Sequence, residues 1–217
     1  MEVLKKFFSY YFGSIFTPQK TFTKLMDEPK KILYFFLILL PFTALDGAVG
    51  IIFIVKDWYP FIPLMINIPK EYYYIAEMFF FGPVTYLNII LAAGIIQVML
   101  YAFKAQQGVA AKFENTLMIA TYGLLGPLFI WNVYDLAFTL LMVFNIMPHD
   151  WFYKHYQEMG IPFFVNLVIV IIGETFHFIS INTALTKVYN LSKIKSIFIT
   201  LFVMVVFFVG WLVLFIR

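Results

Sequence analysis

Glu174 and His177 are the residues whose types and spacing best suit chemistry in this sequence. They lie in the stretch IIGETFHFIS, residues 171–180, which is otherwise apolar, small or hydroxyl-bearing. Three positions apart on a helix, the two side chains are neighbours on one face, where an acid and an imidazole can relay protons or hold an ion. Glu-x-x-His is also half of the pattern of carboxylate-bridged di-metal bundles, which need a second such motif and two further glutamates.

The signatures of other catalytic sites are missing from the sequence. It has no HExxH metalloprotease motif, no Gly-x-Ser-x-Gly nucleophile elbow and no P-loop glycines. The cysteine count of 0 excludes disulfides, thiolate zinc sites and cysteine nucleophiles. A net charge of +3 is too small to indicate nucleic-acid binding. We therefore predict that the protein is not an enzyme and needs no cofactor, with a bound metal cation as the open alternative.

The composition places these residues in a membrane. Of the 217 residues, 63% are hydrophobic and only 12% are charged, where a soluble domain has about a quarter charged. Stretches of roughly 20 apolar residues can cross a bilayer. We predict an all-α, polytopic membrane bundle in which residues 1–30 form an amphipathic interfacial region and residues 31–217 form the membrane domain. Its five spans are expected at about 32–55, 82–103, 115–147, 161–186 and 196–216.

The third of these segments is longer than a bilayer requires. As a straight helix, residues 115–147 would measure about 50 Å, against a hydrocarbon core of ~30 Å. The segment must therefore tilt, kink or project. Gly126-Pro127 is its natural break, because proline removes a backbone donor and clashes with the preceding turn.

The distribution of basic residues predicts the orientation. With the N-terminus inside, the cytoplasmic face holds Lys5, Lys6, Lys20, Lys24, Lys30, Lys31, Lys104, Lys112, Lys187, Lys193 and Lys195. The other face then holds only Lys56, Lys70, Lys154 and Arg217, as the positive-inside rule favours. We therefore expect a multi-pass protein with its N-terminus in the cytoplasm and its C-terminus on the opposite side. His149 and Asp150 are expected in a solvated outer loop beside Trp151.

The sequence of the N-terminal region predicts two amphipathic helices. Apolar residues recur at helical spacing at Val3, Leu4, Phe7, Phe8, Tyr11, Phe12 and Ile15, opposite Glu2, Lys5, Lys6 and Ser9. A short second helix is expected to be capped by Thr17, with Pro18 at its first position and Phe22, Leu25 and Met26 on one face. Lys5, Lys6, Lys20, Lys24, Lys30 and Lys31 form the predicted surface for anionic lipid or a cytoplasmic partner. The helices either lie on the bilayer as an anchor or recruit that partner.

Three stretches resemble the Yip (Ypt/Rab-interacting protein) family in its prokaryotic form. FTPQKTFTKLMDEP, residues 16–29, resembles the proline-led helix before the first span of that family. KFENTLMIATYGLLGPLFI, residues 112–130, resembles its polar turn followed by a small-residue helix with a proline. NTALTKVYNLSKIKSIFITLF, residues 182–202, resembles the short basic turn with a serine that leads into the last span.

The resemblance implies about five membrane helices and a cytoplasmic N-terminus, with roles in vesicle traffic and Rab binding for the eukaryotic members. This chain departs from the family in two places. It lacks the long polar N-terminal domain of many eukaryotic members. It also has GETFHF where an apolar, often Trp-containing fourth span is expected, so the roles of Glu174 and His177 do not come from the family.

Asp46, Asp135, Glu174 and His177 are the ionisable residues expected well inside the spans, where such residues face the bundle interior or water and are paired. Helix geometry places Asp46 and Asp135 in the outer half and the Glu174–His177 pair nearer the cytoplasm, so one shared site is open but is not the default. A stripe with Thr43, Asp46 and Gly50 could face the stripe that carries Glu174 and His177.

Three interpretations of these side chains stay open. They could hydrogen-bond to each other or to Asn88, Gln97, Asn132 or Asp135 and so hold helices together. They could form a proton or cation pathway, or Glu174, His177 and Asp46, with Asp135, could bind one metal ion. We predict a non-enzymatic protein of membrane organisation or trafficking, or a lipid- or partner-binding scaffold. The alternative is a small proton or metal-cation transporter, and for a pore the chain length favours a homo-oligomer.

Overall fold

The computed structural model describes residues 2–58, 69–105 and 112–215, and the regular structure in these ranges is helical. The helices are α1 (Glu2–Phe16), α2 (Pro18–Met26), α3 (Lys31–Leu37), α4 (Leu39–Lys56), α5 (Lys70–Ala102), α6 (Phe113–Val143), α7 (His149–Gln157), α8 (Ile161–Val188) and α9 (Lys193–Phe215). Five segments of these ranges are long and apolar enough to cross a membrane: α3 with α4, and then α5, α6, α8 and α9. The predicted all-α, five-span membrane bundle is confirmed.

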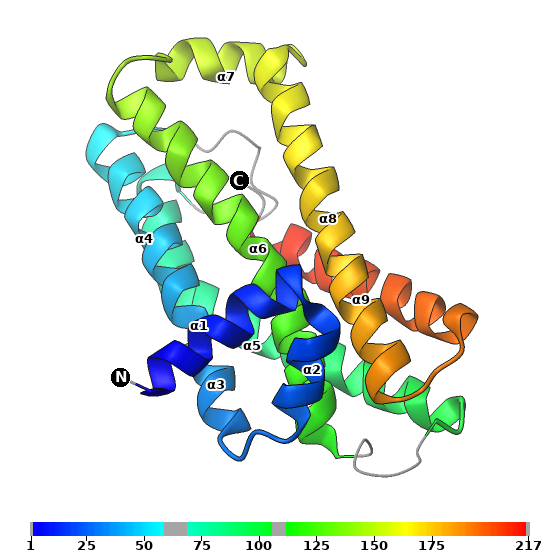
Figure 1. The fold of residues 1–217 in the computed structure, drawn as a ribbon. Coiled ribbons are helices and arrows are strands. Elements are labelled where there is room, and N and C mark those ends of the chain that lie inside the picture. Colours follow the sequence, from blue (N-terminus) through cyan, green and yellow to red (C-terminus); the bar gives the residue numbers. More distant parts are fainter. Residues whose placement is uncertain (1, 59–68, 106–111, 216–217) are drawn as a thin grey trace.

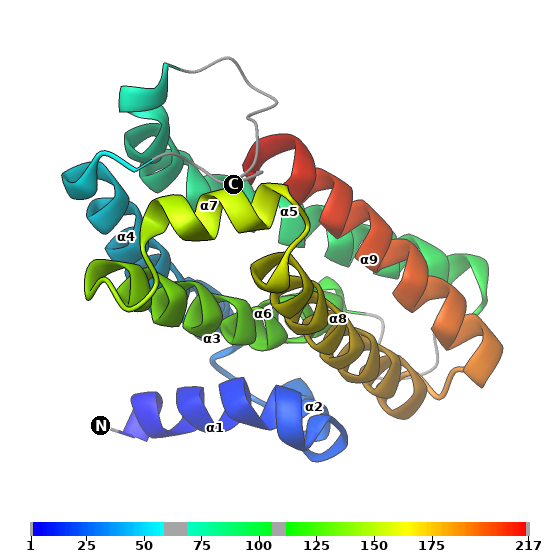
Figure 2. The same cartoon turned by 90° about the horizontal axis from the view of Figure 1, so that it is seen from above.

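The helices form three layers, which Figure 2 shows most clearly. The middle layer holds α4, α6 and α8, with α6 between the other two (Figure 1). α5 and α9 pack against each other and cover one side of this layer. α1 and α2 cover the other side, where α1 packs on α6 and α2 packs on α8. α7 lies across the end where α6 leads into α8.

Two predicted boundaries, one predicted break and one predicted loop differ from the structure. α5 begins at Lys70 rather than near residue 82, because the aromatic and polar turns that precede residue 82 continue the helix. α6 ends at Val143 rather than at residue 147, and it runs through Pro127 without the predicted break. In a membrane helix, neighbouring helices and local adjustments can compensate for the hydrogen bond that proline removes. The expected outer loop at His149 is the start of α7, whose Phe152 is buried.

α6 is the central element of the bundle. Every residue from Asn115 to Leu128 is buried, and α1, α2, α3, α4, α5 and α8 all pack on α6. A helix that is covered on all sides cannot be amphipathic, which explains why its apolar, small and polar residues show no helical periodicity.

Glycines set the distance between α6 and α8. A Cβ added to Gly123 would lie 2.6 Å from Cγ1 of Ile181, and a Cβ added to Gly173 would lie 2.6 Å from Nε1 of Trp131. These two contacts fix the antiparallel register of the helices. His177 is midway between Gly173 and Ile181, so it lies at the level of Pro127, which is midway between Gly123 and Trp131.

We predict that Gly123→Ala destabilises the protein by about 1–3 kcal/mol, because the added methyl group overlaps a rigid, buried Ile181 side chain. Gly94→Ala in α5 is the matched control, since no neighbouring atom lies within 4 Å of its added Cβ and alanine has the higher helix propensity. Thermal unfolding in one detergent measures both. Equal midpoints for the two variants would show that the α6–α8 distance does not depend on Gly123.

Candidate functional site

α1 has three different faces. Its buried face carries Phe7, Tyr10, Tyr11, Ser14 and Ile15. Next to that face, four apolar residues spaced by four positions remain exposed and form what we call the α1 ridge: Leu4 (55% exposed), Phe8 (46%), Phe12 (39%) and Phe16 (71%). The third face is polar, with Glu2, Lys5, Lys6 and Ser9. The prediction that the N-terminal helices only lie on the membrane is therefore incomplete, since one face of α1 is part of the protein core.

Contacts at Ser14 join α1 to both α6 and α8. The Ser180 hydroxyl of α8 donates a hydrogen bond to the carbonyl of Ser14 over 3.0 Å. A Cβ added to Gly126 of α6 would overlap Oγ of Ser14, so α1 crosses α6 at a site without a side chain. These contacts place α1 at the level of the Gly126-Pro127 turn.

The buried face of α2 agrees with the sequence prediction, but the predicted cap at its N-terminus does not form. Phe22, Leu25 and Met26 are buried, and Pro18 occupies the first turn. The Thr17 hydroxyl makes no capping bond to α2. It donates instead to the carbonyl of Gly13 over 3.4 Å, because α1 ends just before it and offers an acceptor.

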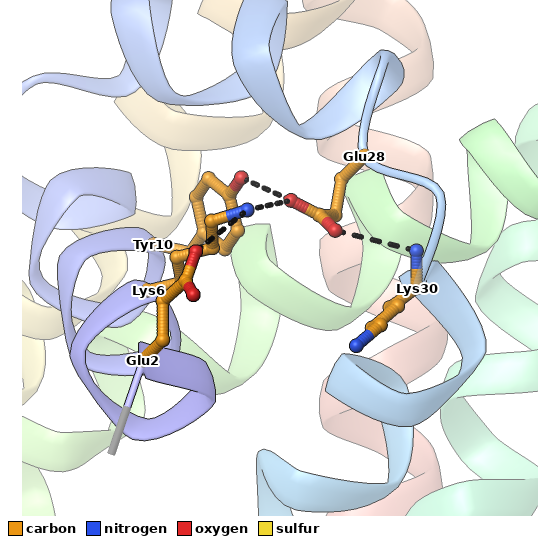
Figure 3. Close-up of polar contacts among 5 residues, drawn as sticks. All are labelled: Glu2, Lys6, Tyr10, Glu28 and Lys30. Carbon is orange, nitrogen blue, oxygen red and sulfur yellow. Dashed lines mark hydrogen bonds and ion pairs between the residues drawn. The ribbon is translucent and has the colours of Figure 1, made fainter.

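A buried carboxylate links α1 to the connection between α2 and α3 (Figure 3). The Tyr10 hydroxyl donates to Oε2 of Glu28 over 2.8 Å, and the Lys30 backbone N–H donates to Oε1 over 3.3 Å. Nζ of Lys6 lies 3.6 Å from Oε2 of the same carboxylate, whose side chain is 5% exposed. Lys6 also faces Glu2 at 4.0 Å.

These donors determine the protonation of Glu28. Burial alone would raise the pKa of its carboxyl, but Tyr10, Lys30 and Lys6 outweigh burial and hold the pKa below its ordinary value of 4.5. Because the pKa of Glu28 is lower in the folded protein than in the unfolded chain, the ionised carboxylate stabilises the fold at pH values above the unfolded-state pKa. This stabilisation is lost as the pH falls below about 4.5.

We predict that Glu28→Gln destabilises the protein by about 1–2 kcal/mol at pH 7, because it replaces charge-assisted bonds by neutral ones. The difference from the parent should shrink as the pH is lowered from 7 to below about 4.5, because the unfolded parent then takes up a proton at this carboxyl and the folded parent does so only at still lower pH. Thermal unfolding across this pH range gives both results. Glu2→Gln is the control: its side chain is 85% exposed, so an effect below about 0.5 kcal/mol is expected. A pH-independent difference for Glu28→Gln would contradict the role of its charge.

The six lysines of the predicted lipid or partner surface fall into two groups. Lys6 is held by Glu28, and Nζ of Lys31 donates to Oδ1 of buried Asn115 over 2.8 Å. Each of these two lysines therefore joins one part of the protein to another. The remaining four lysines, Lys5, Lys20, Lys24 and Lys30, are exposed.

The structure brings Glu174 and His177 together, as the spacing predicts. Nδ1 of His177 lies 3.4 Å from Oε1 of Glu174, with the His177 side chain 2% exposed and the Glu174 side chain 27% exposed. Nε2 of His177 is buried and has no hydrogen-bond partner. At the same level, Pro127 has no N–H to donate to the Gly123 carbonyl. The junction of α6 and α8 therefore combines an unpaired imidazole nitrogen with a gap in the helical hydrogen bonding.

Asp46 and Asp135 do not join this pair. On α6, Asp135 lies eight residues beyond the level of His177, or about 12 Å along the helix. Its carboxylate is close to Tyr156 of α7: burial raises the pKa of Tyr156, the hydrogen bond with Asn166 lowers it and the charge of Asp135 raises it again. Asp46 is near the level of Asp135, since Nδ2 of Asn132 donates to the Phe42 carbonyl, one turn before Asp46, over 3.4 Å.

Two of the arrangements that the sequence left open are not found in the structure. The stripe with Thr43, Asp46 and Gly50 does not face α8: α4 packs on α5 and α6, and Gly50 lies against Met78 of α5. The amides expected near Glu174 and His177 also bond elsewhere: Asn88 donates to the Phe207 carbonyl, Gln97 accepts from Thr116 and Asn132 donates to the Phe42 carbonyl. Among the described residues, no three His, Asp or Glu side chains are grouped closely enough to hold a metal ion, so the proposed ligand set of Glu174, His177, Asp46 and Asp135 is not assembled.

Sequence reasoning missed one further acid. Glu77 is 6% exposed and lies within the second spanning helix. It was overlooked because the predicted span began at residue 82. A run of Tyr72, Tyr73 and Tyr74 one turn earlier signals an interfacial segment that continues the helix.

We predict that His177→Leu changes stability by less than about 1 kcal/mol, because it conserves volume, removes the buried Nε2 that has no partner and breaks only a contact within α8 with the part-exposed Glu174. Ser180→Ala should cost about 1 kcal/mol, because it leaves the Ser14 carbonyl without its donor. Chemical unfolding of the two variants in the same detergent makes the comparison. A larger loss for His177→Leu than for Ser180→Ala would show that the buried imidazole stabilises the bundle more than the bond between α8 and α1 does.

No protein-family model, curated protein or solved structure matches this chain. The resemblance to the Yip family thus stays a prediction from the three quoted stretches.

Proposed function

We propose that the protein is a non-enzymatic membrane-organising scaffold of the Yip type, whose α1–α2 layer binds the cytoplasmic leaflet of the bilayer. The observation that carries this proposal is the exposed α1 ridge of Leu4, Phe8, Phe12 and Phe16 on a helix whose adjacent face is docked to α6 and α8. A helix with an apolar face beside a basic one lies in the membrane interface. Docking to the bundle fixes that helix at a defined depth and angle.

The charges of the same layer support this proposal. Lys5, Lys20, Lys24 and Lys30 are exposed, and each lysine near an anionic leaflet contributes about 1 kcal/mol of binding. The ion pair of Lys6 with Glu28 and the bond of Lys31 to Asn115 hold the layer in place. A transport function has less support, because the intramembrane acids lie at two separate levels.

Single-cysteine spin labelling tests the placement of α1, and the chain has no native cysteine to remove. Labels at Phe8→Cys, Ser9→Cys and Phe7→Cys occupy the ridge, the polar face and the buried face. In vesicles with anionic lipid, the label at position 8 should be relaxed by oxygen, which concentrates in the bilayer. The label at position 9 should be relaxed by a water-soluble nickel complex, and the label at position 7 by neither.

Equal access of the nickel complex to positions 8 and 9 would place the ridge in water and overturn the proposed function. Phe7→Cys also serves as a folding control, because loss of docking would expose its label to one of the two reagents.

A further inference from the structure

A groove lies between α2 and the cytoplasmic end of α8. Its lining residues are Thr17, Pro18, Gln19, Lys20, Thr23, Lys24 and Thr183. Lys20 and Lys24 are one helical turn apart, so both ammonium groups are on one face of α2. Within the part of the chain that the structure describes, no acidic residue lines the groove, and the nearest acid along α2 is the exposed Asp27 at its C-terminal end.

The donors of the groove are the two lysines, an amide and the hydroxyl of Thr183, since the other two hydroxyls are bonded to carbonyls of α1 and α2. Thr17 donates to the Gly13 carbonyl and Thr23 donates to the Gln19 carbonyl over 2.9 Å. Lys20, Lys24 and the side chain of Gln19 thus supply the N–H groups that can reach a bound molecule. Two cations and an amide suit the phosphate of an anionic headgroup.

An apolar surface continues from this groove along α8. Ile172, Phe176, Ile179 and Thr183 follow one another at intervals of three or four residues and share one face of the helix. Ile172 and Ile179 are 39% and 42% exposed. Thr183 is five residues before the end of α8, about 8 Å along the helix. From Thr183 the apolar face continues along α8 towards the middle of the span, and the groove lies at the cytoplasmic end of this face.

We propose that the groove binds the headgroup of one anionic phospholipid, with an acyl chain lying along Ile179, Phe176 and Ile172 of α8. This inference rests on the proposed function and names the lipid class and the site. A soluble acidic protein would match the lysines but not the apolar face that begins beside them within a spanning helix. The excess of two positive charges favours an anionic phospholipid over a zwitterionic one, whose own cation would lie next to the lysines.

Native mass spectrometry of the full chain, released from vesicles of equal phosphatidylglycerol and phosphatidylcholine, tests the headgroup site. The parent should retain one phosphatidylglycerol in preference to phosphatidylcholine. Lys20→Gln/Lys24→Gln should lower this retention at least about tenfold, whereas the charge-matched control Lys112→Gln/Lys193→Gln, at two exposed lysines outside the α1–α2 layer, should keep it.

Ile179→Gln tests the acyl-chain contact. It should also lower retention, and Ile197→Gln on α9, where Ile197 is 39% exposed, should not. Thermal unfolding of each variant in detergent without added lipid checks its fold.

Several results would overturn the site. Equal losses in the two lysine pairs would show general charge attraction, which leaves the proposed function intact because the spin-label positions on α1 are unaffected. Equal retention of both lipids would exclude an anionic headgroup. If inorganic phosphate alone stabilises the protein against heat as much as phosphatidylglycerol does, and Ile179→Gln does not lower lipid retention, the groove recognises the phosphate alone and the acyl-chain contact on α8 is excluded.

Discussion

The close approach of α1, α6 and α8 at small residues is the constraint on which the other features depend. Gly123, Gly126 and Gly173 leave space for side chains of the neighbouring helices, as small residues do at interfaces between membrane helices. Because water does not drive apolar surfaces together inside a bilayer, this packing and the Ser180–Ser14 bond must hold the layers in register. The same register places His177 beside Pro127 and brings α2 against α8.

Hydropathy predicted the spans well because apolar length alone decides whether a helix can cross a bilayer. It placed the start of α5 too late, since Glu77 and the tyrosines before it lower the local hydropathy although Glu77 is buried. Asp46 and Glu174 were each located correctly within a span, but the partner of each depends on which helices are neighbours. Because α6 separates α4 from α8, no pattern within either helix could reveal that these acids lie apart.

The apolar residues of α1 repeat at one helical spacing but lie in two different surroundings. These residues span too wide an arc for a single contact surface, and the structure divides that arc between protein and exterior: Tyr11 is 1% exposed and Phe12, the next residue, is 39% exposed. The sequence predicted the arc but not its division. The division depends on Gly126, which lets α1 approach α6 closely on one side only.

The Ser14–Ser180 contact joins residues 166 positions apart, and this separation bears on the order of synthesis. α1 leaves the ribosome first, but its docking surface is complete only when α8 has been made. At translation rates of about 5–20 residues per second, the wait lasts roughly 8–33 s. During that time both apolar flanks of α1 need shelter, and the bilayer surface can provide it. The wide apolar arc would then suit the nascent chain as well as the folded protein. It would let α1 lie on the leaflet during synthesis and dock one face on the bundle once α8 has been made.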